Sequence, residues 1–348
     1  MIGKDHINVK TDQQDSHQEA HQSWYIIGAG AIGCLWAYAL KEAGHSVTLI
    51  MREHASINEQ SISNTTDNNS RSTQRITLST MDNDSRHADI NTATAHQLIA
   101  SNTIIQHCVI ATKAYDANTA LKSILPALSA SATVLSLCNG MGMHEAMQQQ
   151  LHKHSKKNQL LLGITSDGAL MHSPFQVAHT GIGHTFIGAY ATSSASPNRQ
   201  QKITRHLLPA NFYLQHSLQE NLHAVLWQKM LINCVINPLT VIHQCKNGEL
   251  FSNPKYHSEI RNLCEELSHI FNTLSINPTA ISSETLFDLA KAVAIQTAQN
   301  TSSMLKDAQL GRRLELDAIN GYIVKLAQEQ GINCPINQQL LHTLQQPF

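Results

Sequence analysis

The feature that most constrains this chain is a glycine-rich turn between a short apolar run and a helix-like segment. Apolar residues 24–27 precede the turn Gly-Ala-Gly-Ala-Ile-Gly at 28–33, residues 31–43 have helical periodicity, and residues 47–51 form a second apolar run. Short apolar runs bounded by glycine or polar residues are typical of buried strands. The sequence therefore predicts a β-α-β unit in which the two strands lie parallel.

The turn in this setting predicts a site for the pyrophosphate of a dinucleotide. Gly28 permits the tight turn, Gly30 lets the pyrophosphate approach the backbone, and Gly33 lets the helix pack close to the strand. The first turn of the helix adds unpaired N–H groups and a positive dipole end. An ordinary strand-to-helix turn is the alternative, and the β-α-β context argues against it. The predicted cofactor contacts are Gly28, Ala29, Gly30, Ala31, Ile32 and Gly33.

The end of the second strand indicates which dinucleotide is bound. An acidic residue there usually binds the ribose 2′-hydroxyl of NAD, whereas an arginine accommodates the 2′-phosphate of NADP. Arg52 follows the strand directly and Glu53 comes next. This order favours NADPH, and the alternative is a solvated Arg52 beside a Glu53 that serves the hydroxyl.

The chain after the β-α-β unit alternates strand-like and helix-like segments. Residues 104–111, 133–137 and 160–164 are predicted strands, a helix is predicted from about residue 116, and residues 175–187 have period-two patches that suggest a hairpin at the sheet edge. Such alternation is typical of a doubly wound α/β sheet. We therefore predict an α/β fold with an N-terminal Rossmann-type domain.

The pattern changes near residue 217, after which the chain is predicted to be all-helical. The domain prediction has a polar, disordered extension at 1–23, an NADPH-binding domain at 24–216 with an exposed insert at 55–75, and a helical substrate domain at 217–348. The predicted amphipathic helices span residues 219–242, 255–274, 283–308 and 312–330.

Composition excludes several classes of protein. The formal net charge is −1, so no basic excess suggests binding to nucleic acid. Hydrophobic residues make up 42% of the chain. No uninterrupted apolar run reaches the length of about 18 residues that a membrane span needs. The seven cysteines are scattered, which fits a reducing cytoplasm. The 21 histidines lack metal-ligand spacing, so no metal is predicted and metal-dependent hydrolysis is disfavoured.

A polar stripe crosses the apolar segment 226–239. Lys229, Asn233 and Asn237 stand at i, i+4 and i+8, which places them on one face of a helix that Pro238 is predicted to kink or end. Buried polar groups need partners or a ligand. A lysine ammonium can protonate the alkoxide that forms when a carbonyl is reduced. Spacing alone leaves this role and a structural hydrogen-bond stripe equally open.

A second polar cluster lies at 300–305, and Glu315 follows it. The serine hydroxyls can bind a carboxylate, and Glu315 can pair with Lys229 and keep it charged. From spacing alone, a solvated helix face with Arg312 and Arg313 as partners is the favoured interpretation.

Several sequence blocks, in the right order, resemble the ketopantoate reductase (2-dehydropantoate 2-reductase) family over about residues 24–345. The blocks are the glycine turn, Thr-Lys-Ala at 112–114, Asn-Gly-Met-Gly at 139–142, Leu-Trp-Gln-Lys at 226–229, Asn-Cys-Val-Ile-Asn-Pro-Leu-Thr at 233–240, Asn-Gly-Glu-Leu at 247–250, Ser-Ser-Met-Leu at 302–305 and Asp-Ala-Ile-Asn-Gly at 317–321.

The resemblance implies a role for each site residue. Lys229 is similar to the family's general acid, and Glu315 matches the acid that interacts with substrate and lysine. The matched cofactor positions are Arg52 at the 2′-phosphate, with Lys113 and Asn139 toward the nicotinamide side of the cleft. The matched substrate positions are Asn233, Asn237, Asn247, Asn300 and Ser303.

The resemblance implies an NADPH-dependent reduction of 2-dehydropantoate to (R)-pantoate in pantothenate and coenzyme A synthesis. It also implies a cytoplasmic monomer or homodimer whose partner is a small-molecule substrate, without nucleic acid or membrane. Leu314 stands where the family commonly has threonine, and Asp167 adds a carboxylate near the cleft that can alter substrate preference. Two alternatives remain open: a reductase of another branched 2-keto acid, and a non-catalytic NADP(H)-binding sensor.

Overall fold

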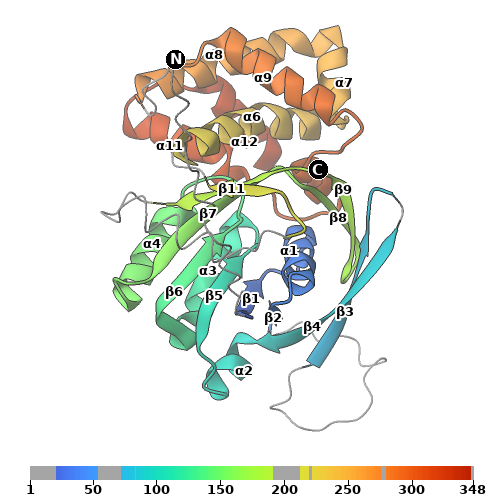
Figure 1. The fold of residues 1–348 in the computed structure, drawn as a ribbon. Helices are drawn as coiled ribbons and strands as arrows, with labels where there is room; N and C mark the ends of the chain where they lie inside the picture. The colour runs from blue at the N-terminus through green and yellow to red at the C-terminus, as the bar shows by residue number, and fades with distance from the viewer. Residues whose placement is uncertain are drawn as a thin grey trace, which may run out of the picture.

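A computed structural model describes residues 21–53, 72–82, 84–190, 212–218, 222–275 and 280–345. Figure 1 shows a twisted sheet with helices on its faces, and a cluster of helices from the last third of the chain stacked beyond one end of the sheet. The strands are β1 (Ser23–Ile27), β2 (Ser46–Met51), β3 (Ser72–Ser79), β4 (Ser85–Thr94), β5 (Ile105–Ile110), β6 (Leu128–Ser136), β7 (Gln159–Thr165), β8 (Gly168–Ser173), β9 (Gln176–Gly181), β10 (Thr185–Ala189) and β11 (His216–Leu218).

The helices divide into two groups along the chain. Those between the strands are α1 (Ala31–Glu42), α2 (Ala95–Ala100), α3 (Ala114–Ile124), η2 (Leu125–Ala127) and α4 (Met143–His154). Those after the sheet are α6 (Leu222–His243), α7 (Asn247–Ser252), η3 (Pro254–Tyr256), α8 (His257–Thr273), α9 (Ser283–Gln296), α10 (Ser303–Gln309), η4 (Leu316–Ala318), α11 (Asn320–Glu329) and α12 (Pro335–Gln345). The predicted change to an all-helical pattern is therefore confirmed.

The strand order is β11-β10-β7-β6-β5-β1-β2-β4-β3-β9-β8, and the stretch from β7 to β4 is parallel. From β1 the chain proceeds through β2 to β4 on one side and then through β5 to β7 on the other. The order thus reverses beside β1, and in such sheets ligands bind outside the carboxyl ends of the strands at the reversal. The prediction of a doubly wound sheet is confirmed.

The two faces of the sheet bury separate sets of side chains. Trp24 and Ile26 of β1 pack with α1 on one face, whereas Tyr25 and Ile27 pack with α3 on the other. This alternation follows from the two-residue period of a strand. The second core continues into the helices after the sheet, through Trp227 of α6 among others. One apolar core therefore joins the sheet to α6, the helix that carries the polar stripe.

The hairpin prediction is wrong. Residues 175–187 do not form a hairpin, because β9 pairs with β3 and β8 while β10 pairs with β7 and β11 at the opposite side of the sheet. At the edge formed by β8, the hairpin consists of β8 and β9, and Phe175 in its turn has a φ of +63°. Residues 72–75, predicted to be part of an exposed insert, are the first half of β3. Residues 1–20 of the predicted extension and residues 55–71 of the predicted insert lie outside the described residues.

Two predicted helices are interrupted. The segment 283–308 divides into α9 and α10, because the Ser302 side chain caps a new helix by accepting from the Leu305 N–H at 3.1 Å. The segment 312–330 contains the short η4 before α11. Helical periodicity continues across both interruptions, so it marks the buried face without marking the breaks.

Helix α6 passes through Pro238 without ending there. Proline has no N–H, so the carbonyl of Cys234, four residues earlier, loses its partner within the helix. The Asn320 side chain at the start of α11 donates to this oxygen at 3.0 Å and to Asn337 Oδ1 at 2.9 Å. A buried carbonyl needs such a partner, so Asn320 lets α6 continue past Asn237.

The Asn320 contact predicts a measurable loss of stability. In Asn320→Leu the Cys234 carbonyl becomes a buried acceptor without a partner, which costs about 1–3 kcal/mol. Urea unfolding should show this decrease in the free energy of unfolding. Gln328→Leu, on the exposed surface of the same helix, should change it by less than about 0.5 kcal/mol. Equal effects for the two variants would refute the compensation.

By length and composition α6 is the one helix in the described ranges that is apolar enough to cross a membrane, but 72% of its most apolar stretch is buried inside the protein. The sequence shows no uninterrupted apolar run of this length, since Lys229 and two asparagines divide it. The helix contacts α7, α8, α9, α10 and α12. It is the central helix of the region after the sheet.

Candidate active site

The glycine turn lies at the carboxyl end of β1, where the strand order reverses. Gly28 has a φ of +108°, and a Cβ there would lie 2.5 Å from the Ala111 oxygen. A Cβ on Gly33 would lie 1.8 Å from the Gly28 oxygen. A Cβ on Gly30, in contrast, would meet nothing within 4 Å. The first and third glycines are therefore needed for packing, while the second faces open space at the start of α1, which suits a pyrophosphate.

Arg52 lies just beyond the end of β2, the neighbour of β1 in the sheet. Its side chain is 81% exposed and forms an ion pair with Asp116 in the first turn of α3. The arginine is thus held at the same sheet edge as the glycine turn. Its exposure leaves the guanidinium accessible to a phosphate.

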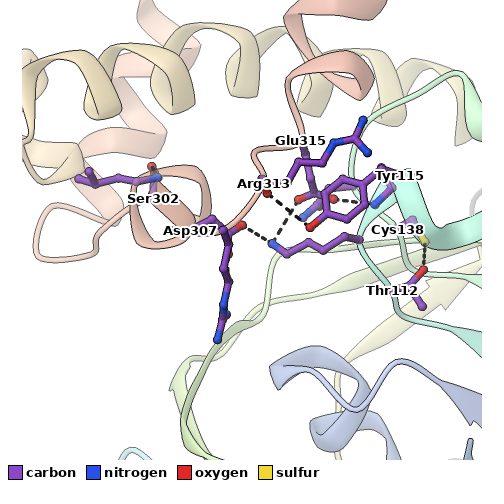
Figure 2. Close-up of polar contacts among 12 residues, drawn as sticks. Thr112, Tyr115, Cys138, Ser302, Asp307, Arg313 and Glu315 are labelled. Carbon is purple, nitrogen blue, oxygen red and sulfur yellow. Dashed lines mark hydrogen bonds and ion pairs between the residues drawn. The ribbon is translucent and has the colours of Figure 1, made fainter. Parts of the chain in front are cut away.

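A cluster of charges joins this sheet edge to the helices after the sheet. Lys113, directly before α3, donates to Asp307 of α10 and to Glu315 Oε2 at 3.4 Å. The other Glu315 oxygen accepts from the Ala114 N–H at 2.9 Å. Figure 2 shows Asp307 and Glu315 converging on the segment that bears Thr112 and Tyr115. Both carboxylates are buried, so their charges depend on these partners.

Lys113 remains charged in this cluster. Burial alone would lower the pKa of its ammonium, but the charges of Glu315 and Asp307 and their hydrogen bonds outweigh burial and raise the pKa. Sequence reasoning missed Asp307. Its only signal is a carboxylate on the buried side of a short amphipathic helix, where a charge needs a partner.

A second contact ties the strand-end loop to the chain beside Glu315. Gly140 has a φ of +80°, and a Cβ there would lie 2.3 Å from the Ala318 oxygen. The Met141 N–H donates to this same oxygen at 2.8 Å. The close approach requires glycine at position 140. It fixes the loop that begins at Asn139 against η4, which directly follows Glu315.

Lys229 projects from α6 to the carboxyl ends of the strands. Its ammonium donates to Asn139 Oδ1 at 3.2 Å and to the Thr165 carbonyl oxygen at 2.8 Å. Burial lowers the pKa of Lys229 to about 8, against the opposing charge of Glu315. A lysine with a pKa near neutrality can release its proton readily, as a general acid must.

A pocket opens where these elements meet. Its lining combines the ends of β6 and β7 with one face of α6, and consists of Cys138, Asn139, Gly140, Gly163, Ile164, Leu226, Lys229, Met230 and Asn233. Burial raises the pKa of the Cys138 thiol to about 11, so this group stays protonated and is no nucleophile at neutral pH. Lys229 is therefore the one lining group that carries a charge.

The predicted site residues fall into groups. Lys229, Asn233 and Asn139 meet at the pocket, whereas the other predicted substrate residues do not line it. Asn237 lies one helical turn further along α6 and is buried. The predicted pairing of Glu315 with Lys229 is absent: across the described ranges, Glu315 is hydrogen-bonded to Lys113 and Ala114 instead.

Two of the remaining predicted substrate residues, Asn247 and Asn300, meet at the start of α7, and Ser303 is the first residue of α10. The Asn247 N–H donates to the Asn300 oxygen at 3.1 Å, and Asn247 Nδ2 donates to Thr297 Oγ1 at 2.9 Å. Asn247 Oδ1 is buried and has no protein partner within the described part of the chain. The Asn300 and Ser303 residues are exposed. This arrangement leaves one amide oxygen and two exposed polar residues for a ligand.

Asp167 does not line the pocket, so its carboxylate makes no direct contact there, and an effect on substrate preference stays a prediction. Its side chain is 1% exposed and turns inward to His179. Within the described ranges, no group of three His, Cys, Asp or Glu side chains is placed to hold a metal ion.

Comparison with known proteins extends over both parts of the chain. The family described as "Ketopantoate reductase PanE/ApbA" matches residues 24–192, and "Ketopantoate reductase PanE/ApbA C terminal" matches residues 221–347. The 2-dehydropantoate 2-reductase of Vibrio cholerae is 31% identical over 93% of this chain and 98% of its own length. The enzyme of that name from Escherichia coli O157:H7 is 30% identical over 90% of this chain and 91% of its own length.

Solved structures share the fold. A PanE/ApbA family ketopantoate reductase from Ralstonia eutropha JMP134 has a TM-score of 0.74 at 24% identity, covering 92% of this chain and 96% of the other. Together with the two matched regions, which cover most of the chain, these likenesses show that the chain belongs to the ketopantoate reductase family of oxidoreductases.

Proposed function

We propose that the protein reduces 2-dehydropantoate to (R)-pantoate with NADPH, in the synthesis of pantothenate and coenzyme A. The single observation that carries this proposal is the Lys229 ammonium, with a pKa of about 8, at a pocket beside the carboxyl ends of the parallel strands. The relatives from Vibrio cholerae and Escherichia coli bear the name of this reaction.

Residues of the sheet domain (24–216 in our proposed division) would hold the cofactor. The glycine turn 28–33 would receive the pyrophosphate, and Arg52 the 2′-phosphate. Lys113 and Asn139 lie toward the helical domain (217–348), where the nicotinamide would lie. When bound, the nicotinamide supplies a hydride to the keto carbon.

Lys229 would supply the matching proton. As the keto carbon gains a hydride, its oxygen becomes an alkoxide, and the ammonium Nζ donates a proton to that oxygen. The amine is then neutral and takes up a proton from water before the next turnover. The Asn139 and Thr165 oxygens hold Nζ at the pocket, so the donor is oriented before substrate binds.

The other predicted residues would bind the rest of the substrate. Asn233 lines the pocket next to Lys229 and can hold the carbonyl oxygen without adding charge. Glu315 contributes a negative charge that raises the pKa of Lys229. Asn237, Asn247, Asn300 and Ser303 lie further along the helical region and would reach the substrate's hydroxyl and carboxylate groups when the two domains close.

The proposal is tested by following NADPH oxidation with 2-dehydropantoate and, separately, with 2-ketoisovalerate. We expect a higher kcat/KM for 2-dehydropantoate. A large preference for 2-ketoisovalerate would identify a reductase of another branched 2-keto acid instead. Binding of NADPH without turnover of either compound would identify a sensor.

Cofactor preference tests the role of Arg52. Arg52→Ala removes a charged hydrogen-bond donor to the 2′-phosphate, which is worth about 1.5–3 kcal/mol. The Kd for NADPH should therefore rise about tenfold or more, while the Kd for NADH should stay within about twofold. Both are measured by quenching of protein fluorescence. Arg75→Ala is the matched control, because Arg75 on β3 is another exposed arginine in an ion pair, with Asp89 of β4, and it should change neither value.

If Arg52→Ala binds NADPH as tightly as the wild-type protein does, Arg52 is not the 2′-phosphate contact. An equal weakening for NADPH and NADH would point to a general disturbance of the sheet edge.

A further inference from the structure

A buried carboxylate lies behind the pocket, in the turn between β7 and β8. Asp167 Oδ2 accepts from the Thr165 hydroxyl at 2.9 Å, and Asp167 Oδ1 accepts from the Gly183 N–H at 3.0 Å. Its other partner is His179 Nε2, 3.1 Å from Oδ1. Both oxygens are thus occupied, which a carboxylate with a side chain 1% exposed requires.

These contacts make the turn rigid. The Thr165 hydroxyl donates to the Asp167 side chain and accepts from the Asp167 N–H at 3.1 Å. Each residue therefore fixes the other, and the backbone between them has little freedom. Gly183, just before β10, ties the same carboxylate to the next strand of the sheet.

His179 of β9 secures the carboxylate from the other side. Its Nε2 donates to Asp167, and its Nδ1 lies within hydrogen-bond distance of the Tyr213 hydroxyl, at 3.2 Å. Burial opposes ionisation of Asp167, but the hydrogen bonds from His179, Gly183 and Thr165 outweigh burial and lower its pKa. The carboxylate is charged at neutral pH, when its acceptor capacity is greatest.

The backbone that this network fixes includes the partner of Lys229. The Thr165 carbonyl oxygen accepts from Lys229 Nζ at 2.8 Å, a shorter contact than the 3.2 Å to Asn139. Ile164 and Gly163, the preceding residues of β7, line the pocket. Asp167 contacts Thr165, and Thr165 contacts the Lys229 amine, so Asp167 reaches the amine only through Thr165. The Asp167 side chain does not line the pocket itself.

We propose that Asp167 is a positioning residue, which together with His179 fixes the β7–β8 turn so that the Thr165 carbonyl oxygen holds the Lys229 ammonium at the pocket. The inference rests on the proposed function, because it assigns this role within the same proton transfer. The carboxylate acts through Thr165 and never touches the substrate.

The role predicts a defined effect on Lys229. Its amine faces the neutral Asn139 amide and the Thr165 carbonyl, and the charged group that acts on it is Glu315. A carbonyl acceptor favours the ammonium over the neutral amine. If the turn loosens and this acceptor moves away, burial and the Glu315 charge remain, so the pKa of Lys229 falls below about 8.

The test compares Asp167→Ala and Thr165→Val with the wild-type protein. Thr165→Val removes the hydroxyl that links the carboxylate to the turn and leaves the Asp167–His179 contact in place. In both variants kcat for 2-dehydropantoate should fall about 10- to 100-fold, with KM and the Kd for NADPH nearly unchanged. The alkaline limb of the kcat/KM profile should move to lower pH, because the acid loses its proton earlier.

A measurement without turnover separates this inference from the proposed function. The Lys229 side chain is titrated by NMR in lysine-labelled protein, and its signal is assigned by its loss in Lys229→Ala. A lower pKa in Asp167→Ala and Thr165→Val supports the positioning role even if the wild-type protein reduces another keto acid. An unchanged Lys229 titration in both variants overturns it, whatever happens to kcat.

Asn158→Ala is the matched control for lost stability. Asn158 is buried directly before β7, and its Oδ1 accepts from the Ala132 N–H at 3.0 Å. The substitution therefore removes a buried polar contact at the other end of the same strand. It should lower Tm without moving the Lys229 titration or the alkaline limb. A shift equal to that of Asp167→Ala would mean that any weakening of β7 disturbs the amine, and would overturn the specific role.

Discussion

Replacing Lys229 by alanine is expected to lower kcat for 2-dehydropantoate reduction by about 10²–10⁴-fold, the usual contribution of a positioned general acid. The variant keeps the glycine turn and Arg52, so its Kd for NADPH should stay within about threefold of the wild-type value. Steady-state rates at saturating substrate and a fluorescence titration with NADPH measure the two quantities. Loss of turnover with retained binding places Lys229 in the chemical step.

Lys325→Ala is the matched control, because Lys325 is 71% exposed and only distantly paired with Glu329 on α11. Its kcat should equal that of the wild-type protein. If Lys229→Ala also turns over at the wild-type rate, another group donates the proton. If Lys229→Ala fails to bind NADPH, the substitution has disturbed the sheet edge. Lys229→Met, which keeps the length of the apolar stem, then tests whether Lys229 is the proton donor.

The pH dependence of the wild-type enzyme follows from the same group. Burial lowers the pKa of Lys229 to about 8, and only the protonated amine can act as the acid. The kcat/KM value should therefore be constant below that pH and fall as pH rises through it. In Lys229→Ala this limb should disappear from the residual rate.

Local patterns in the sequence predict much of the fold. The turn 28–33 predicts β1, α1 and their parallel partner, because glycine spacing and strand period act within a few residues. The pairing of strands is harder to predict from the sequence. Strand β9 pairs with β3, about one hundred residues earlier, and no local pattern identifies that pairing. Period-two alternation marks residues 175–187 as strand without saying which neighbours they take.

The candidate site is likewise predictable from local patterns only in part. The spacing of Lys229 and Asn233 places both at the pocket, because helical periodicity sets their common face. Their partners come from distant segments, and the oxygen nearest Lys229 is the backbone carbonyl of Thr165, which any residue type would supply. Asp307 and Asp167 acquire their roles only through burial against Lys113 and His179. Such contacts arise from tertiary packing.

The glycine turn gives the second large expected effect, a substitution that weakens NADPH binding and leaves the stability of the fold nearly unchanged. Gly30→Ala should raise the Kd for NADPH at least about tenfold, because the added methyl group occupies the space into which the pyrophosphate would approach the backbone. The free protein tolerates this methyl group: Gly30 has a φ of −81°, and the new Cβ meets nothing within 4 Å. Its free energy of unfolding should change by less than about 1 kcal/mol.

Gly33→Ala is the comparison that makes the result specific. There the new Cβ would lie 1.8 Å from the Gly28 oxygen, so α1 must move away from the turn, and both Tm and NADPH binding should decrease. The pair thus distinguishes a glycine required by the cofactor from a glycine required by the fold. Should Gly30→Ala bind NADPH with the wild-type Kd, the open side of the turn is not the pyrophosphate site, and the assignment of residues 28–33 to the cofactor is wrong.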